Sequence, residues 1–137
     1  MNKHKWILLA EDNENDADLA LRALSFNQAP QDVIVARDGA EALDCLYQRE
    51  GFHQRGTGNP TVVLLDLKMP RVDGLEVLRQ VKADPRLRTI PIVMLTSSRE
   101  EADVARSEQA GSLMHLTKPV DVNALEAAIK VLTSIRN

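Results

Sequence analysis

The sequence predicts an α/β fold with a doubly wound, five-stranded parallel sheet in the strand order 2-1-3-4-5. Short apolar runs rich in Val, Ile and Leu recur along the 137 residues, as is typical of strands buried on both faces. Segments with apolar residues at helical spacing lie between these runs. Because strand and helix alternate, we expect parallel neighbours joined by helical crossovers. A chain of this length is expected to form one domain, residues 1–137.

Five apolar runs are expected to form the strands. The third run is the most apolar and should lie at the centre of the sheet, whereas the fifth is the weakest. In chain order the runs are Trp6 to Ala10, Val33 to Ala36, Thr61 to Leu65, Ile92 to Leu95 and Leu113 to Leu116.

Helical segments follow the strands, with apolar side chains three, four and seven residues apart. Their apolar positions include Ala17, Leu21 and Leu24; Ala40, Leu43 and Tyr47; Gly74, Val77, Leu78 and Val81; and Val122, Leu125, Ile129 and Leu132. The segment Glu100 to Ala110 has helical propensity but a weak apolar side, so it should pack loosely. Asp38, Asp73 and Asp121 are placed to begin the helices that follow them. The stretch Gln48 to Pro60 shows no period and is expected to be a connection.

Composition and charge narrow the classes of function. Hydrophobic residues make up 44% of the chain and charged residues 27%, so a packed core is expected. The formal net charge of −3 gives no reason to expect direct binding to nucleic acid. Cys45 is the only cysteine, which excludes an intramolecular disulfide and fits the reducing cytoplasm. The first apolar run is too short for a signal sequence or a membrane span, so no membrane partner is expected.

Polar residues follow the strands at the edge where a doubly wound sheet binds ligands. Glu11 and Asp12 follow the first strand, Asp66 the third, Thr96 the fourth and Lys118 the fifth. Taken singly, an acidic residue after a strand most often caps a turn or a helix. Four strand ends that together supply acids, a hydroxyl and an ammonium group point instead to a functional site.

Converging carboxylates repel each other unless a cation lies among them. Mg²⁺, or Mn²⁺ in its place, prefers hard oxygen ligands, and the cluster offers Glu11, Asp12, Asp66 and a nearby backbone carbonyl. With the charge neutralised, one carboxylate can attack phosphorus and form an acyl phosphate. Asp66 is the candidate nucleophile because it ends the central strand. The Lys118 ammonium and the Thr96 hydroxyl can then stabilise the phosphoryl oxygens.

Five segments carry a wider pattern: Ile7 to Asn13, Leu64 to Pro70, Asp73 to Gly74, Pro91 to Ser97 and Lys118 to Pro119. In this combination and order they resemble the response regulator receiver family of two-component signalling, over essentially the whole chain. The resemblance implies a flavodoxin-like receiver fold and transfer of a phosphoryl group to Asp66 from the phosphohistidine of a sensor histidine kinase. It also implies that Glu11, Asp12, Asp66 and the backbone carbonyl of Lys68 hold the metal.

The same resemblance assigns Thr96 and Lys118 as phosphate-sensing residues and implies a cis bond before Pro119. The connection before Pro60 and the stretch from Pro85 to Thr96 resemble more narrowly the small single-domain regulators that serve bacterial phytochromes. A bacterial phytochrome is therefore the expected kinase.

One position departs from the family pattern. Three residues before Lys118, where the family usually has Tyr or Phe, the chain has His115. Because histidine commonly changes charge near neutral pH, we hypothesise that the output of this switch residue depends on pH. Partner binding of equal affinity at pH 6 and pH 8 would contradict this hypothesis.

The leading interpretation is a binding module controlled by phosphorylation, not a turnover enzyme. Because the chain ends just after its last helix, we expect no output domain. The output surface is expected on the fourth helix (Glu100 to Ala110), the fifth strand and the last helix, and to contact a downstream protein or a second copy in a homodimer. A phosphatase or phosphotransferase is the alternative, but it would need an acid two residues after Asp66, where the chain has Lys68. A passive phosphate sink is a third possibility that the sequence does not separate from the first.

Overall fold

The computed structural model describes residues 6–25, 32–47, 58–69, 71–96, 105, 109, 114–118 and 121–136, the side chains of 129 and 132–136 excepted. Three predictions fall outside this part of the chain. They concern most of the connection before Pro60, the loosely packed helix Glu100 to Ala110 apart from positions 105 and 109, and the peptide bond before Pro119.

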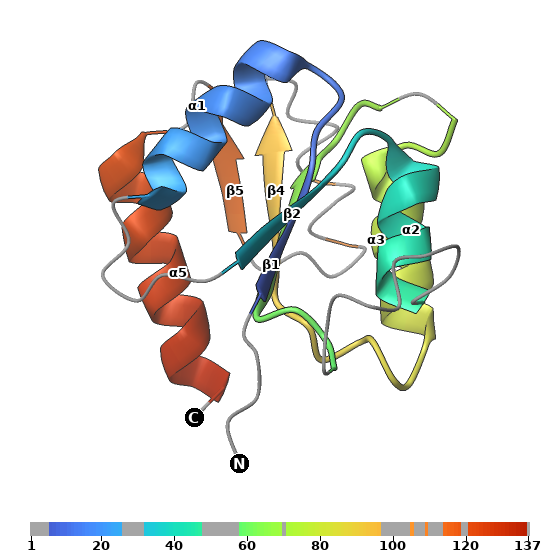
Figure 1. The fold of residues 1–137 in the computed structure, drawn as a ribbon. Coiled ribbons are helices and arrows are strands. Elements are labelled where there is room, and N and C mark those ends of the chain that lie inside the picture. Colours follow the sequence, from blue (N-terminus) through green and yellow to red (C-terminus); the bar gives the residue numbers. More distant parts are fainter. Residues whose placement is uncertain are drawn as a thin grey trace.

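Five parallel strands form one sheet in the order β2-β1-β3-β4-β5, which confirms the predicted fold class and strand order (Figure 1). The strands are β1 (Trp6–Ala10), β2 (Asp32–Ala36), β3 (Val62–Asp66), β4 (Ile92–Thr96) and β5 (Met114–Thr117). β1 and β3 are buried along their whole length, in agreement with their unbroken apolar sequences.

Three strands, β3, β4 and β5, end one residue later than the sequence pattern indicated, and β5 ends at Thr117. Asp66 and Thr96 are the last residues of β3 and β4, whereas the sequence suggested that they follow these strands. The reason lies in the backbone ladder. The Leu67 N–H donates to the Leu95 carbonyl at 3.0 Å, and the Lys118 N–H donates to the Thr96 carbonyl at 2.8 Å. The polar side chains are therefore held by regular strand pairing instead of by loops.

The helices that the structure describes lie on both faces of the sheet (Figure 1). α1 (Glu14–Ser25) and α5 (Val122–Arg136) lie on one face, and α2 (Gly39–Tyr47) and α3 (Gly74–Ala83) lie on the other. Side chains of each strand alternate between two apolar cores. In β1, Ile7 and Leu9 pack with α1 and α5, whereas Trp6 and Leu8 pack with α2 and α3.

The predicted cap at Asp121 is present, and Asp38 and Asp73, predicted as turns into the second and third helices, also cap them. The carboxylates of Asp38, Asp73 and Asp121 each accept the backbone N–H of the residue three positions later, at 2.8 to 2.9 Å. Each cap satisfies an N–H group at a helix start that has no partner inside its helix. The three caps also fix where α2, α3 and α5 begin, at the carboxyl edge of the sheet.

Two glycines allow the loops at this edge to pack against each other. A Cβ atom on Gly39 would overlap the Val72 carbonyl oxygen, and one on Gly74 would overlap the Asp66 carbonyl oxygen. A larger residue at either place would force the backbone apart. The loop that follows Asp66 is thus packed closely against the strand that carries Asp66.

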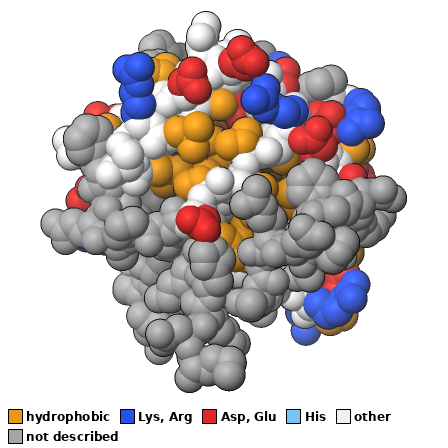
Figure 2. Space-filling model, in the orientation of Figure 1, with side chains coloured by type: hydrophobic (Ala, Val, Ile, Leu, Met, Phe, Trp, Pro, Cys, Tyr) orange, Lys and Arg blue, Asp and Glu red, His pale blue; other side chains and the backbone are white. Residues whose placement is uncertain are grey.

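The face of the molecule in Figure 2 looks onto β2, which forms one edge of the sheet. Figure 2 shows apolar side chains gathered near the centre of this face. Within β2, Val33, Ile34 and Val35 are half-buried. Among the helices in the described part of the chain, none combines the length and the apolar character needed to cross a membrane.

Candidate functional site

The carboxyl edge of the sheet brings together the residues that the sequence singled out there. Glu11 directly follows β1, Asp66 ends β3, Thr96 ends β4 and Lys118 directly follows β5. Glu11, Asp66 and Thr96 are buried, with 1%, 5% and 4% of their surface exposed. Asp12 is exposed beside them. Because β1, β3, β4 and β5 are adjacent and parallel, their carboxyl ends place these side chains in one site.

The ammonium group of Lys118 lies at the centre of this site and contacts three carboxylates. Its Nζ atom is 2.9 Å from Glu11 Oε1, 3.1 Å from Asp16 Oδ2 and 3.3 Å from Asp66 Oδ1. Only 9% of the Lys118 side chain is exposed. Since an ammonium group has three N–H donors, three carboxylate acceptors match its capacity.

Sequence reasoning missed one of these partners, Asp16. It lies in the first turn of α1, and its backbone N–H donates to the Asn13 side-chain oxygen at 3.0 Å. The pattern of Asn13 followed three residues later by an acid is typical of a helix start and could have been recognised. That the carboxylate points to Lys118, 102 residues away, is visible only in the fold.

The pKa of the Asp66 carboxyl group is raised to about 7. Burial is the main cause, and the negative charge of neighbouring Glu11 adds to it, while Lys118 acts in the opposite direction. Burial by itself would lower the pKa of Lys118, but its hydrogen bond to Glu11 and the charge of Asp66 outweigh burial and raise it. The surroundings thus destabilise the ionised form of Asp66, which added positive charge would stabilise, whereas Lys118 stays a cation.

The donors in this site suit a hard divalent cation. Glu11, Asp12 and Asp66 can each offer one carboxylate oxygen, and these atoms lie within 4.8 Å of one another. The donors of this group are all oxygens, as Mg²⁺ and Mn²⁺ prefer. Since the charge of Glu11 helps to raise the pKa of Asp66 even with Lys118 nearby, a bound cation would stabilise the ionised carboxylates. The group therefore fits the predicted metal site.

The remaining candidates occupy positions around this cluster. Lys68 is exposed in the loop after β3, and its backbone carbonyl stays a predicted ligand. His115 lies in β5, is half-buried, and pairs in register with Met94. Thr96 pairs with Thr117 in the same ladder. Both proposed switch residues therefore belong to neighbouring strands, β4 and β5.

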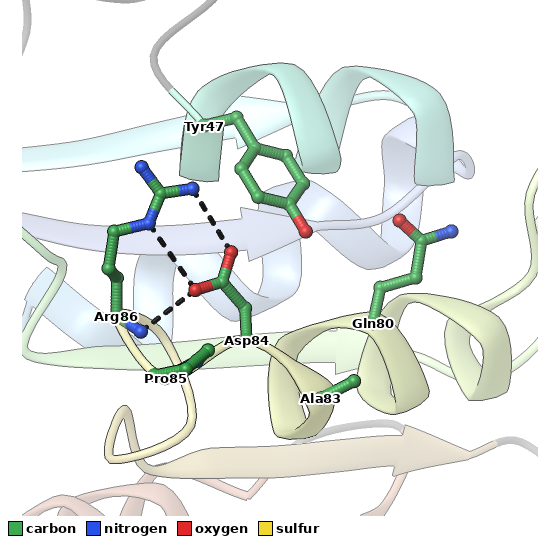
Figure 3. A pocket seen from close by; sticks show the side chains of 6 residues that line it. All are labelled: Tyr47, Gln80, Ala83, Asp84, Pro85 and Arg86. Carbon is green, nitrogen blue, oxygen red and sulfur yellow. Dashed lines mark hydrogen bonds and ion pairs between the residues drawn. The ribbon is translucent and has the colours of Figure 1, made fainter.

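A hollow lies at the end of the molecule opposite the acidic site, where α2 and α3 end (Figure 3). Its volume is about 510 Å³. The lining residues are Tyr47, Gln80, Ala83, Asp84, Pro85 and Arg86. Figure 3 shows Arg86 paired with Asp84, at 3.1 Å between Nη2 and Oδ2. Since helices begin at the carboxyl edge and end at the amino edge, this hollow is separate from the acidic site.

Comparison with protein-family models finds one match that spans most of the chain. The family described as the response regulator receiver domain matches residues 7–130. The matched range includes each of the site residues named above, from Glu11 to Lys118.

Three relatives illustrate what the chain is similar to. The bacteriophytochrome response regulator AtBRR is 52% identical, with a TM-score of 0.85 over 96% of this chain and 94% of that one. The phosphorylated cyanobacterial phytochrome response regulator RcpA is 36% identical, with a TM-score of 0.78 over 96% and 91%. Response regulator Rcp1 of Synechocystis sp. is 35% identical over 97% of this chain and 89% of its own sequence. The Mn²⁺-bound structure of Rcp1 has a TM-score of 0.77 over 96% and 91%.

Proposed function

The chain belongs to the response regulator receiver family of two-component systems, and from this we propose that Asp66 is its phosphoacceptor. In this proposal residues 1–137 act as a single receiver domain. A sensor histidine kinase supplies the phosphoryl group from a phosphohistidine. The protein is then a binding module whose shape depends on phosphorylation, not a turnover enzyme.

The observation that carries the proposal is the position of Asp66 beside Lys118 and Glu11. The Asp66 carboxylate ends a central strand, is 5% exposed, and lies 3.3 Å from the Lys118 ammonium. An ordinary helix-capping acid would be exposed and bonded to backbone N–H groups. Burial among other acids costs free energy that capping does not require, so this arrangement favours a chemical role.

In the transfer, an Asp66 oxygen attacks phosphorus and the bond from phosphorus to the imidazole nitrogen of the kinase breaks. The products are an acyl phosphate and a neutral kinase histidine after proton uptake. Lys118 and the Thr96 hydroxyl are placed at adjacent strand ends to donate to the phosphoryl oxygens. Mg²⁺ or Mn²⁺, held by Glu11, Asp12, Asp66 and the Lys68 carbonyl, would supply the positive charge that the carboxylates and the phosphoryl group need.

Output is proposed to leave through the surface of the fourth helix (Glu100 to Ala110), β5 and α5. Thr96 and His115 lie on the adjacent strands β4 and β5, so a change at the Asp66 phosphate can reach this surface through one pair of strands. The partner there is a downstream protein or a second copy of the chain. The hypothesis that output depends on pH through His115 concerns this same transmission from the phosphate to the surface.

A bacterial phytochrome is the proposed kinase. The support is the similarity to AtBRR and RcpA, whose names connect them with phytochromes. The proposed location is the cytoplasm, where such kinases present their phosphohistidine. The net charge of −3 argues against direct binding to nucleic acid.

The test uses purified protein, Mg²⁺ and a small acyl phosphate as donor, with intact mass as the readout. Wild type should gain one phosphoryl group, and Asp66→Ala should gain none. Asp18→Ala, an exposed acid on α1, is the matched control and should be labelled like wild type. Chelation of the metal should abolish labelling. Labelling of Asp66→Ala to the wild-type level would overturn the proposal. Repeated turnover of a metabolite would favour the alternative that the protein is a phosphatase or phosphotransferase.

A further inference from the structure

Lys118 contacts three acidic residues in the described part of the chain, and these three are not equivalent. Glu11 and Asp66 belong to the group of carboxylates that fits a metal ion, whereas Asp16 does not. Any charge brought to the metal group competes with Lys118 for Glu11 and Asp66. Asp16 is therefore the one described partner of Lys118 whose carboxylate the metal and phosphoryl sites do not also use.

Asp16 is well placed to act as a fixed anchor. It is the third residue of α1, and the Asn13 side chain holds its backbone N–H at 3.0 Å. The adjacent Ala17 and the later Ala20 are buried in the core between α1, α5 and the sheet. A carboxylate on such a rigid element loses little conformational entropy when it holds a partner.

The surroundings make the contact stronger than a surface ion pair. The Lys118 side chain is 9% exposed and that of Asp16 is 30% exposed. Water screens charges less at this depth, so the 3.1 Å separation carries more free energy than the same distance on the surface. Without Asp16, and with Glu11 and Asp66 occupied by a metal ion, the long, flexible lysine side chain would have many other conformations.

From these contacts we infer that Asp16 is a positioning residue, which holds the Lys118 ammonium beside Asp66 while Glu11 and Asp66 serve the metal and the phosphoryl group. This inference rests on the proposed function for its role in phosphoryl transfer. The anchoring contact itself does not depend on that function, and it can be measured without phosphate.

The first measurement is the rate at which an amine-acetylating reagent modifies Lys118, followed by peptide mass spectrometry in the presence of a chelator and again with Mg²⁺. Asp16→Ala should speed modification at least threefold, and more with Mg²⁺ present. Asp18→Ala removes the same charge from an exposed position of the same helix and should leave the rate unchanged. Asp16→Glu keeps a carboxylate and should restore most of the protection. Equal rates in Asp16→Ala and Asp18→Ala would overturn the inference.

The second measurement is the rate constant of phosphorylation at saturating Mg²⁺. We expect Asp16→Ala to lower it about fivefold, with no further loss when Asp16→Ala is added to Lys118→Ala, because Asp16 acts through the ammonium group. Independent effects of the two substitutions would overturn this role. If wild type accepted no phosphoryl group while Asp16→Ala still exposed Lys118 to the reagent, the proposed function would fail and the anchoring contact would stand.

Discussion

At the scale of single residues, Asp66 links the chemistry of the site to the stability of the fold. Its folded-state pKa is about 7, against an ordinary value of 3.8. Between these two pH values the folded protein binds a proton that the unfolded chain has released. Rising pH therefore lowers the free energy of unfolding across this range, until the loss is complete above pH 7.

Asp66→Asn should remove this loss, because an amide does not ionise. With a chelator present, we expect the variant to gain stability over wild type as pH rises from 5 to 8, by on the order of 2 kcal/mol. Urea denaturation at the two pH values measures the gain. Mg²⁺ should reduce it by stabilising the ionised wild type. A difference that stays constant with pH would show that Asp66 titrates normally in the folded protein.

At the scale of elements, an ion pair joins the two loops that flank the acidic site. Arg71, in the loop between β3 and α3, donates to both oxygens of Asp38 at 2.9 and 3.1 Å. Arg71 has a left-handed backbone with φ of 67°, which is uncommon for a residue other than glycine. Asp38 also caps α2, so one carboxylate holds the start of a helix and the neighbouring loop.

The hydrogen bond from Arg71 holds the pKa of Asp38 below its ordinary 3.8. The pair therefore stabilises the fold above that pH, and its contribution is lost as pH falls through the lowered pKa. We expect Arg71→Ala to lower the urea midpoint slightly at pH 7, with the difference from wild type shrinking as the pH falls below 3.8 and through the lowered pKa of Asp38. Asp38→Asn keeps the cap but removes the charge. In that background Arg71→Ala should have much less effect, and an undiminished effect would argue against the ion pair.

At the scale of the whole molecule, the sheet separates two apolar cores but also joins them. Trp6 lies in the core under α2 and α3, is 2% exposed, and donates its indole N–H to the Gly58 carbonyl at 3.1 Å. Leu125 of α5 is 1% exposed in the other core. Since β1 contributes side chains to both cores, neither face should unfold alone.

Leu125→Ala tests whether the two cores unfold together. The cavity that it leaves should lower the free energy of unfolding by about 2–5 kcal/mol. Because the two cores unfold together, Trp6 fluorescence should report the same shift in the urea midpoint as far-UV circular dichroism. Val131→Ala, on the same helix but 46% exposed, is the control and should change the free energy of unfolding by about 0.5 kcal/mol or less. If the fluorescence transition stayed at the wild-type midpoint while the circular dichroism moved, the two faces would be independent units.

Local patterns in the sequence determined the alternation of strands and helices, the strand order and the helix starts at Asp38, Asp73 and Asp121. These features follow from hydrophobic spacing, crossover handedness and cap chemistry, which act over a few residues or obey general rules. The acidic cluster of Glu11, Asp12 and Asp66 was also predictable, because carboxyl ends of parallel strands meet at one edge.

The tertiary structure alone decided which side chains touch. Asp16 meets Lys118 and Arg71 meets Asp38 across 102 and 33 residues of chain. No periodicity connects such positions, since their contact depends on how helices and loops pack at the sheet edge. The raised pKa of Asp66 has the same origin, because burial and the distance to Glu11 exist only in the folded protein.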